Sequence, residues 1–91
     1  MEFAWDIAKS DATFAAWGFG FAVAASIFAG GAVEAEDTRQ DYGEVRVRAI
    51  GRSVTGMVLS VVYADRGEVR RIISARVAGR RERVEWLRQS A

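Results

Sequence analysis

The chain has 91 residues, of which 51% are hydrophobic, and it contains no cysteine, histidine or proline. This length predicts one small domain over residues 1–91. The missing residue types exclude disulfides and the usual thiolate and imidazole metal sites, so a metal ion would have to be held by carboxylates alone. We expect no metal ion and no cofactor.

Charge is distributed unevenly along the chain. Residues 1–44 carry eight acidic and two basic side chains, a net charge of −6, whereas residues 45–91 carry four acidic side chains and eleven arginines, a net charge of +7. Arginine is suited to bidentate contacts with phosphate, which makes the C-terminal half the candidate for binding an anionic ligand. The alternative is that arginine merely replaces lysine on solvated faces.

The N-terminal third predicts a strand followed by two helices. Phe3–Trp5 is a short alternating run, and Asp6 is placed to cap a helix over Ile7–Trp17 that ends at Gly18. A second helix carries an apolar stripe that should face the core, formed by Phe21, Ala24, Ala25 and Phe28. We expect Trp17, Phe19 and Phe21 to cover a sheet, unless one of these aromatic side chains stays on the surface to anchor a partner.

Residues 12–33 contain no charged side chain, and such a run is long enough to cross a bilayer as a helix. Alanine and glycine dominate the run, however, and acidic rather than basic residues flank it, so orientation signals are missing. The acidic start also lacks the positive leading region of a signal peptide. We therefore expect no membrane span, and a small membrane protein remains the third interpretation.

The remaining chain predicts strands at 32–36, 44–50, 57–63 and 69–76, then a helix at about 79–89 with Val84 and Leu87 toward the sheet. In the second of these strands Val45, Val47 and Ala49 should share one face. Residues 57–63 are almost continuously apolar, as in a strand buried on both faces. The short turns favour antiparallel pairing. The predicted fold is therefore α+β: a strand, two helices, an antiparallel four-stranded meander and a C-terminal helix.

The last predicted strand and the helix after it hold the densest run of arginine. Regular alternation would place Arg70, Ile72, Ser74 and Arg76 on one face of the strand and Arg71 on the other. We expect Arg76 and Arg70 to belong to one site, and Arg71 not to belong to it.

Several sequence words together resemble the BrnT family of toxins over nearly the whole chain. They are Trp5-Asp6 with Lys9, Gly43-Glu44-Val45-Arg46, Gly51-Arg52-Ser53, Arg71-Ile72-Ile73-Ser74-Ala75-Arg76 and Arg80-Arg81-Glu82-Arg83. The resemblance implies a RelE-like fold, a cytoplasmic ribonuclease that blocks translation, and a hetero-oligomer with a cognate BrnA antitoxin that has a ribbon-helix-helix DNA-binding part. Family members usually carry Lys-His before the glycine that ends the first helix, but here Ala16 and Trp17 stand there.

Metal-free RNA cleavage needs a base for the 2′-hydroxyl, an acid for the leaving oxygen and cations for the charge on the phosphoryl oxygens. Without histidine, a carboxylate, Lys9, a tyrosine or a perturbed arginine must serve as the base. Glu44 is the first candidate because it shares the predicted strand face of Arg46, and Glu82 is the second. Arginine stays protonated, so Arg46 and Arg76 are expected to clamp phosphate.

The arginines around this predicted site have a second expected role, contact with the RNA backbone. They are Arg70, Arg80, Arg81 and Arg83. The alternatives are that Glu44 and Arg46 form an ordinary exposed pair and that the helical arginines are only solvated.

Two other functions use the same basic surface. An acidic segment of an antitoxin could cover it and compete with RNA for Arg76. The absence of Lys-His also allows a catalytically degenerate member, a binding module that stabilises the antitoxin and tunes autorepression.

Overall fold

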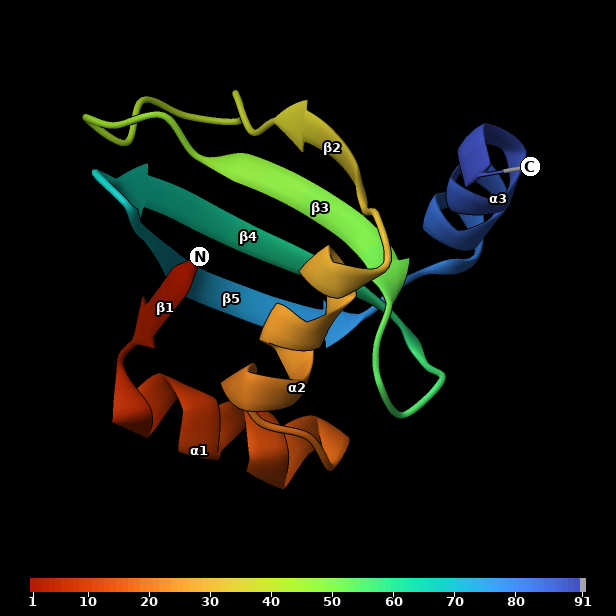
Figure 1. Ribbon diagram of the computed structural model, residues 1–91, viewed down its shortest axis with the longest axis horizontal. Helices are drawn as coiled ribbons and strands as arrows, with labels where there is room; N and C mark the ends of the chain where they lie inside the picture. The colour runs from red at the N-terminus through yellow and green to blue at the C-terminus, as the bar shows by residue number, and fades with distance from the viewer. Residues whose placement is uncertain (91) are drawn as a thin grey trace.

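The computed structural model describes residues 1–90, which form one five-stranded sheet with helices against it (Figure 1). In chain order the elements are β1 (Glu2–Trp5), α1 (Ile7–Trp17), α2 (Phe21–Ala25), the 3-10 turn η1 (Ser26–Ala29), β2 (Val33–Glu36), β3 (Val47–Arg52), β4 (Val58–Arg66), β5 (Val69–Val77) and α3 (Arg80–Ser90). The strand order is β1-β5-β4-β3-β2, with β1 parallel to β5 and the other neighbours antiparallel. The predicted α+β fold, with its antiparallel four-stranded meander, is confirmed.

Helix α1 has the ends that its sequence predicts. The Asp6 carboxylate accepts hydrogen bonds from the backbone N–H groups of Ala8 at 2.9 Å and Lys9 at 3.3 Å. At the other end Gly18 adopts φ 83°, a left-handed conformation that favours glycine. Figure 1 shows α1 and α2 on one side of the molecule and α3 apart from them.

The core lies between α2–η1 and one face of the sheet. Phe21, Ala24 and Ile27 pack there against a set of strand residues that includes Leu59, Val61 and Ile72. Each large side chain buried in this way contributes about 1.5–3 kcal/mol. The predicted apolar stripe is confirmed as core at Phe21, Ala24 and Ala25, and Phe28 packs against that core while partly exposed. Phe19 is buried as well.

Trp17 differs from the other aromatic residues near the end of α1. Its exposed fraction is 48%, whereas Phe19 and Phe21 are 2% and 1% exposed. The expectation that all three cover the sheet is therefore wrong for Trp17.

None of the described helices is by itself long and apolar enough to cross a membrane. Helix α1 and the following helical segment pass the length and composition test only together, and their axes are bent by 92° at the break between them.

Strand β3 begins three residues later than the alternating pattern predicts. Glu44 and Val45 precede it, and Val45 is 64% exposed instead of facing the core. Strand β2 pairs with β3 only from Ile50 back to Val47, and the chain leaves β2 at Asp37, whose N–H donates to the Arg46 carbonyl at 2.7 Å. β2 therefore does not continue alongside residues 44–46, and these residues lie outside β3. The prediction that Glu44 and Arg46 share a strand face is wrong.

A β-bulge in β5 reverses which face its side chains occupy. Val62 pairs with Ser74 but Tyr63 pairs with Ile72, so Ile73 is an extra residue in β5. Arg70 and Ile72 consequently lie on the face covered by α2–η1, while Ser74 and Arg76 lie on the other face, called the open face below. The register puts Arg71 on the open face as well, opposite Ala64. The predicted sharing of one face by Arg70 and Arg76 is therefore wrong.

Helix α3 buries none of its residues, and Val84 and Leu87 are 46% and 57% exposed. The prediction that these two residues face the sheet is wrong. Helix α3 is held instead through Glu82 and Trp86, which are four residues apart and share a helix face. The guanidinium of Arg52 lies 5.2 Å from the centre of the Trp86 ring. Because these two contacts fix the rotation of α3, Val84 and Leu87 point elsewhere.

Candidate functional site

The open face carries a pocket of about 150 Å³ whose polar lining is entirely basic or hydroxylic. We call it the arginine pocket, and it is lined by Arg39, Arg48, Ser60, Val62, Ser74, Ala75 and Arg76. Three guanidinium groups supply fixed positive charge, and two hydroxyls can donate hydrogen bonds. This set of donors suits a phosphate or another small anion. A larger groove of about 520 Å³ between β1 and α2–η1 has no charged lining residue and does not suit such a ligand.

Strand register brings most of this pocket together. Arg48 on β3 pairs with Val62 on β4, which pairs with Ser74 on β5. One step along the sheet, Ser60 on β4 pairs with Arg76 on β5. The bulge at Ile73 is required for this arrangement, because it turns Ser74 and Arg76 toward the open face.

Arg39 reaches the pocket from the loop that follows β2. Its Nε and Nη2 donate to the two carboxylate oxygens of Asp37, each at 2.8 Å, and the Tyr42 hydroxyl donates to the same carboxylate at 3.2 Å. The Asp37 side chain is 2% exposed. The hydrogen bonds from Arg39 hold the pKa of Asp37 well below its ordinary value. Asp37 therefore remains ionised and fixes the position of Arg39.

Arg76 is joined to the first turn of α3 by a two-pronged ion pair. Its Nη1 and Nη2 donate to the Glu82 carboxylate at 2.6 and 3.0 Å. The same carboxylate accepts from the Gly79 N–H at 2.8 Å and lies 3.7 Å from Nη1 of Arg48. Arg76 first, and then the Gly79 amide, lower the pKa of Glu82 to about 2. Glu82 is thus a carboxylate anion held beside the arginine pocket.

Glu44 and Arg46 lie together, but neither lines the arginine pocket. Glu44 forms ion pairs with Arg66 at 3.2 Å and with Arg46 at 3.5 Å. The guanidinium of Arg46 also stacks 4.2 Å from the centre of the Tyr42 ring. Both residues line a separate cleft beside the loop at 36–46.

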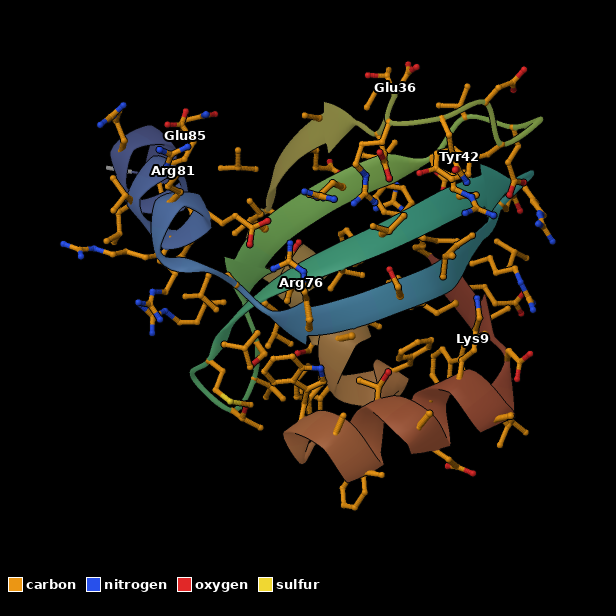
Figure 2. All side chains as sticks on the ribbon, turned by 180° about the vertical axis from the view of Figure 1, so that it is seen from behind. Lys9, Glu36, Tyr42, Arg76, Arg81 and Glu85 are labelled. Atoms are coloured by element: carbon orange, nitrogen blue, oxygen red, sulfur yellow. The ribbon has the colours of Figure 1, made fainter. Side chains whose placement is uncertain are left out.

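Lys9 and Arg70 do not join the arginine pocket. Lys9 Nζ donates to the Ile73 carbonyl at 3.4 Å, at the bulge, and Figure 2 shows Lys9 on α1 apart from Arg76. Arg70 pairs with Asp65 at 2.8 Å, and its guanidinium lies 3.9 Å from the centre of the Tyr63 ring. Asp65 raises the pKa of Arg70. Arg70 is therefore held on the helix-covered face.

The other arginines proposed to contact RNA are on α3 and exposed to solvent. They are Arg80, Arg81 and Arg83, and none forms an ion pair within residues 1–90. Figure 2 shows Arg81 on α3, with Arg76 on the strand that leads to it. These side chains extend the positive charge of the pocket along the helix.

Four pocket residues were missed by sequence reasoning: Arg39, Arg48, Ser60 and Ser74. Arg48 could have been found from its alternation with Arg46, and Ser60 as the lone hydroxyl inside the apolar stretch from Met57 to Val62. Ser74 had been placed on the face of Arg76 but given no role. Nothing in the sequence pattern indicated Arg39, because a loop conformation brings it to the pocket.

Within the described residues, no group of three or more carboxylates gathers as a metal ion would require. The pocket offers cationic and hydroxyl groups, which can stabilise an anion electrostatically.

The fold and the arginine pocket define a class of small α+β proteins suited to a phosphate-bearing ligand, and comparisons with known proteins narrow that class. A family model described as "Ribonuclease toxin, BrnT, of type II toxin-antitoxin system" matches residues 5–82. The crystal structure of the Brucella abortus ribonuclease toxin BrnT is similar, with a TM-score of 0.66 and 26% sequence identity over 88% of this chain and 99% of that one. No curated protein sequence matches. The chain belongs to the BrnT family of ribonuclease toxins of type II toxin-antitoxin systems.

Proposed function

We propose that this protein cleaves RNA without a metal ion and thereby inhibits translation in the cytoplasm. The observation that carries the proposal is the arginine pocket, where Arg39, Arg48 and Arg76 surround a space suited to one phosphate. Cations fixed in advance around a phosphoryl group stabilise the negative charge that builds up during cleavage. Membership of a family of ribonuclease toxins supports RNA as the ligand of this pocket.

Each group in the pocket has a separate proposed role. The guanidinium groups bind the phosphoryl oxygens, and the hydroxyls of Ser60 and Ser74 orient them. Arg71 and the exposed arginines of α3 contact neighbouring phosphates of the strand, which adds affinity without sequence preference.

Glu44 is the proposed base of the reaction. Glu82 is poorly suited to that role, because Arg76 lowers its pKa to about 2 and so makes it a weak proton acceptor near neutral pH. Glu44 lines a separate cleft and not the arginine pocket, so this role requires an RNA strand whose scissile nucleotide reaches both. The substitution Glu44→Gln tests the role. If cleavage continues at the wild-type rate in a folded Glu44→Gln variant, Glu44 is not the base.

The proposed partner is an antitoxin of the BrnA type, with a ribbon-helix-helix DNA-binding part, in a stable hetero-oligomer. Membership of a type II toxin-antitoxin family supports an antitoxin partner. The exposed apolar residues Phe14, Trp17, Val84 and Leu87 are available to such a partner.

Expression of the chain alone in bacteria tests the nuclease proposal. We expect growth arrest and fragmented RNA, with full relief on coexpression of the antitoxin encoded beside it. Arg76→Ala, produced at the same soluble level, is the matched control. Normal growth and intact RNA with abundant soluble wild-type protein would rule out an active nuclease.

A second function, a catalytically degenerate binding module, is favoured by one specific observation. Ala16 and Trp17 stand where the family usually has Lys-His, and both are exposed at the end of α1. In that case the purified chain leaves RNA intact yet still binds and stabilises the antitoxin. The double substitution Ala16→Lys and Trp17→His should then create nuclease activity, whereas equal activity of both proteins would show that these positions are dispensable.

A further inference from the structure

Arg76 cannot bind a phosphate with its two-pronged end while Glu82 is in place. Nη1 donates to one oxygen of Glu82 and to the Val77 carbonyl, at 2.6 and 3.3 Å, and Nη2 donates to the other oxygen of Glu82 at 3.0 Å. The fork that makes arginine a good phosphate ligand is therefore directed at a carboxylate of the same chain.

The surroundings of the Glu82 carboxylate form a complete anion-binding site. The groups that face it are the two terminal nitrogens of Arg76, Nη1 of Arg48, the Gly79 N–H and the Ser60 hydroxyl. They come from β5, β3, β4 and the residue before α3, so the site is built by tertiary structure and not by one helix end alone. Arg48 and Arg76 also line the arginine pocket beside it.

We infer that these groups form a phosphate subsite for RNA and that Glu82 is its internal competitor, which one phosphate of the bound strand displaces. The inference rests on the proposed RNA-binding function and extends it by naming the subsite and what limits its affinity. Glu82 thereby weakens RNA binding in the free protein. Because Arg48 and Arg76 serve both anions, only one anion at a time can use them fully.

The first turn of α3 can release Glu82 because its other side chains, Arg80, Arg81 and Arg83, are exposed and form no ion pair within residues 1–90. Farther along, α3 lies against β2 and β3. No residue of α3 is buried. Besides the ion pairs of Glu82, the helix contacts the sheet through the Trp86 ring, over which the Arg52 guanidinium lies. Gly79, an exposed residue without a side chain, joins α3 to the end of β5.

A structural role for Glu82 predicts the opposite outcome, so the two can be separated. Glu82 also caps α3 by accepting from the Gly79 N–H, as in a capping box, a role that glutamine can fill. The substitution Glu82→Gln therefore preserves the cap and removes the negative charge. Glu85→Gln is the matched control. Glu85 is on the same helix, labelled in Figure 2, and within residues 1–90 it pairs with Arg88 and Gln89 and not with the pocket.

The experiment measures binding of a fluorescently labelled single-stranded DNA of about twelve thymidines by fluorescence anisotropy. This probe lacks the 2′-hydroxyl that the proposed cleavage requires, so it is bound but not cleaved. The binding result therefore stands whether or not the protein proves to be an active nuclease. Circular dichroism verifies that every variant is folded.

We expect Glu82→Gln to bind the DNA about fivefold more tightly than the wild type. The slope of log K against log salt concentration should stay close to the wild-type value, because the same phosphate occupies the subsite in both complexes and only its competitor is removed. Glu85→Gln should change affinity much less and leave that slope unchanged. Adding Arg76→Ala to Glu82→Gln should abolish the gain.

Three outcomes would overturn the inference. Unchanged or weaker binding by folded Glu82→Gln would mean that Glu82 positions Arg76 and does not compete with phosphate. An equal gain in DNA affinity for Glu85→Gln would show that the effect comes from the overall charge of the protein and not from the subsite. A gain that survives in the double variant with Arg76→Ala would show that Glu82 does not compete with phosphate for Arg76. Should Glu82→Gln fail to fold, Glu82→Ala is judged by the same criteria.

Discussion

Arg70 and Arg76 project from opposite faces of β5, because the extra residue at Ile73 reverses the alternation between them. Arg70 stacks on Tyr63 and Phe28, with its guanidinium 3.9 and 4.7 Å from their ring centres, whereas Arg76 lines the arginine pocket. The bulge thus assigns one arginine to the helix-covered layer and the other to the open face.

Substitutions of the neighbouring residues Arg70 and Arg71 should therefore have opposite effects. Arg70→Ala removes two ring contacts and the pairing with Asp65, and it should lower the free energy of unfolding by about 1–3 kcal/mol while leaving DNA binding intact. Arg71→Ala should leave stability nearly unchanged and weaken binding to single-stranded DNA about threefold. Urea unfolding and anisotropy titrations measure both quantities. The reverse pattern would contradict the assignment of faces.

Arg76→Ala should abolish most of the nuclease activity, because the pocket loses one of three cations. Loss of one donor to a transition-state anion costs about 10²–10³ in rate. Arg76→Lys keeps the charge but not the fork, so it should recover only part of the rate. Rates are measured on a fluorogenic RNA, alongside the melting temperature of each variant. Wild-type rates for folded Arg76→Ala would remove this residue from the site.

Asp37→Asn should weaken anion binding in the arginine pocket, although Asp37 does not line that pocket itself. The variant loses the charge that holds Arg39, so Arg39 leaves the pocket and affinity for single-stranded DNA should fall about tenfold. Thr38→Ala, in the same loop, is the control and should retain wild-type binding. If Arg39→Ala and Asp37→Asn fail to give similar losses, Asp37 does not act through Arg39.

Acid should weaken the attachment of α3 to the sheet. Arg76 lowers the pKa of Glu82 from 4.5 to about 2, so the stabilisation is fully present above about pH 4.5 and is lost as the pH falls toward 2. Acid should lower the free energy of unfolding, and the Arg76–Glu82 pair should account for about 1–2 kcal/mol of that loss once its partial exposure to solvent is allowed for. Unfolding of wild type and Glu82→Gln is compared at about pH 7 and about pH 3. An equal pH dependence in the two proteins would contradict this assignment.

The sequence by itself determined the elements whose signals are local. Asp6 and Gly18 mark the ends of α1, and the spacing of Phe21, Ala24 and Ala25 marks the buried side of α2. The apolar run before Tyr63 indicated the central strand, and short turns indicated its antiparallel neighbours. Each of these signals depends on the conformation or burial of a few consecutive residues, so no distant contact is needed to read it.

Tertiary structure alone decided the composition of the site. The bulge at Ile73 depends on how β5 pairs with β4, and it exchanged Arg70 for Arg71 on the open face. Arg39 reaches the pocket because Asp37 is buried, and the rotation of α3 follows from the contacts of Glu82 and Trp86. The sequence predicted Arg76 as a site residue and the C-terminal half as the basic half, but it gave no sign of Arg39, which lies in the N-terminal half. Which cations surround one anion depends on strand register and loop packing, because these join residues that are far apart along the chain.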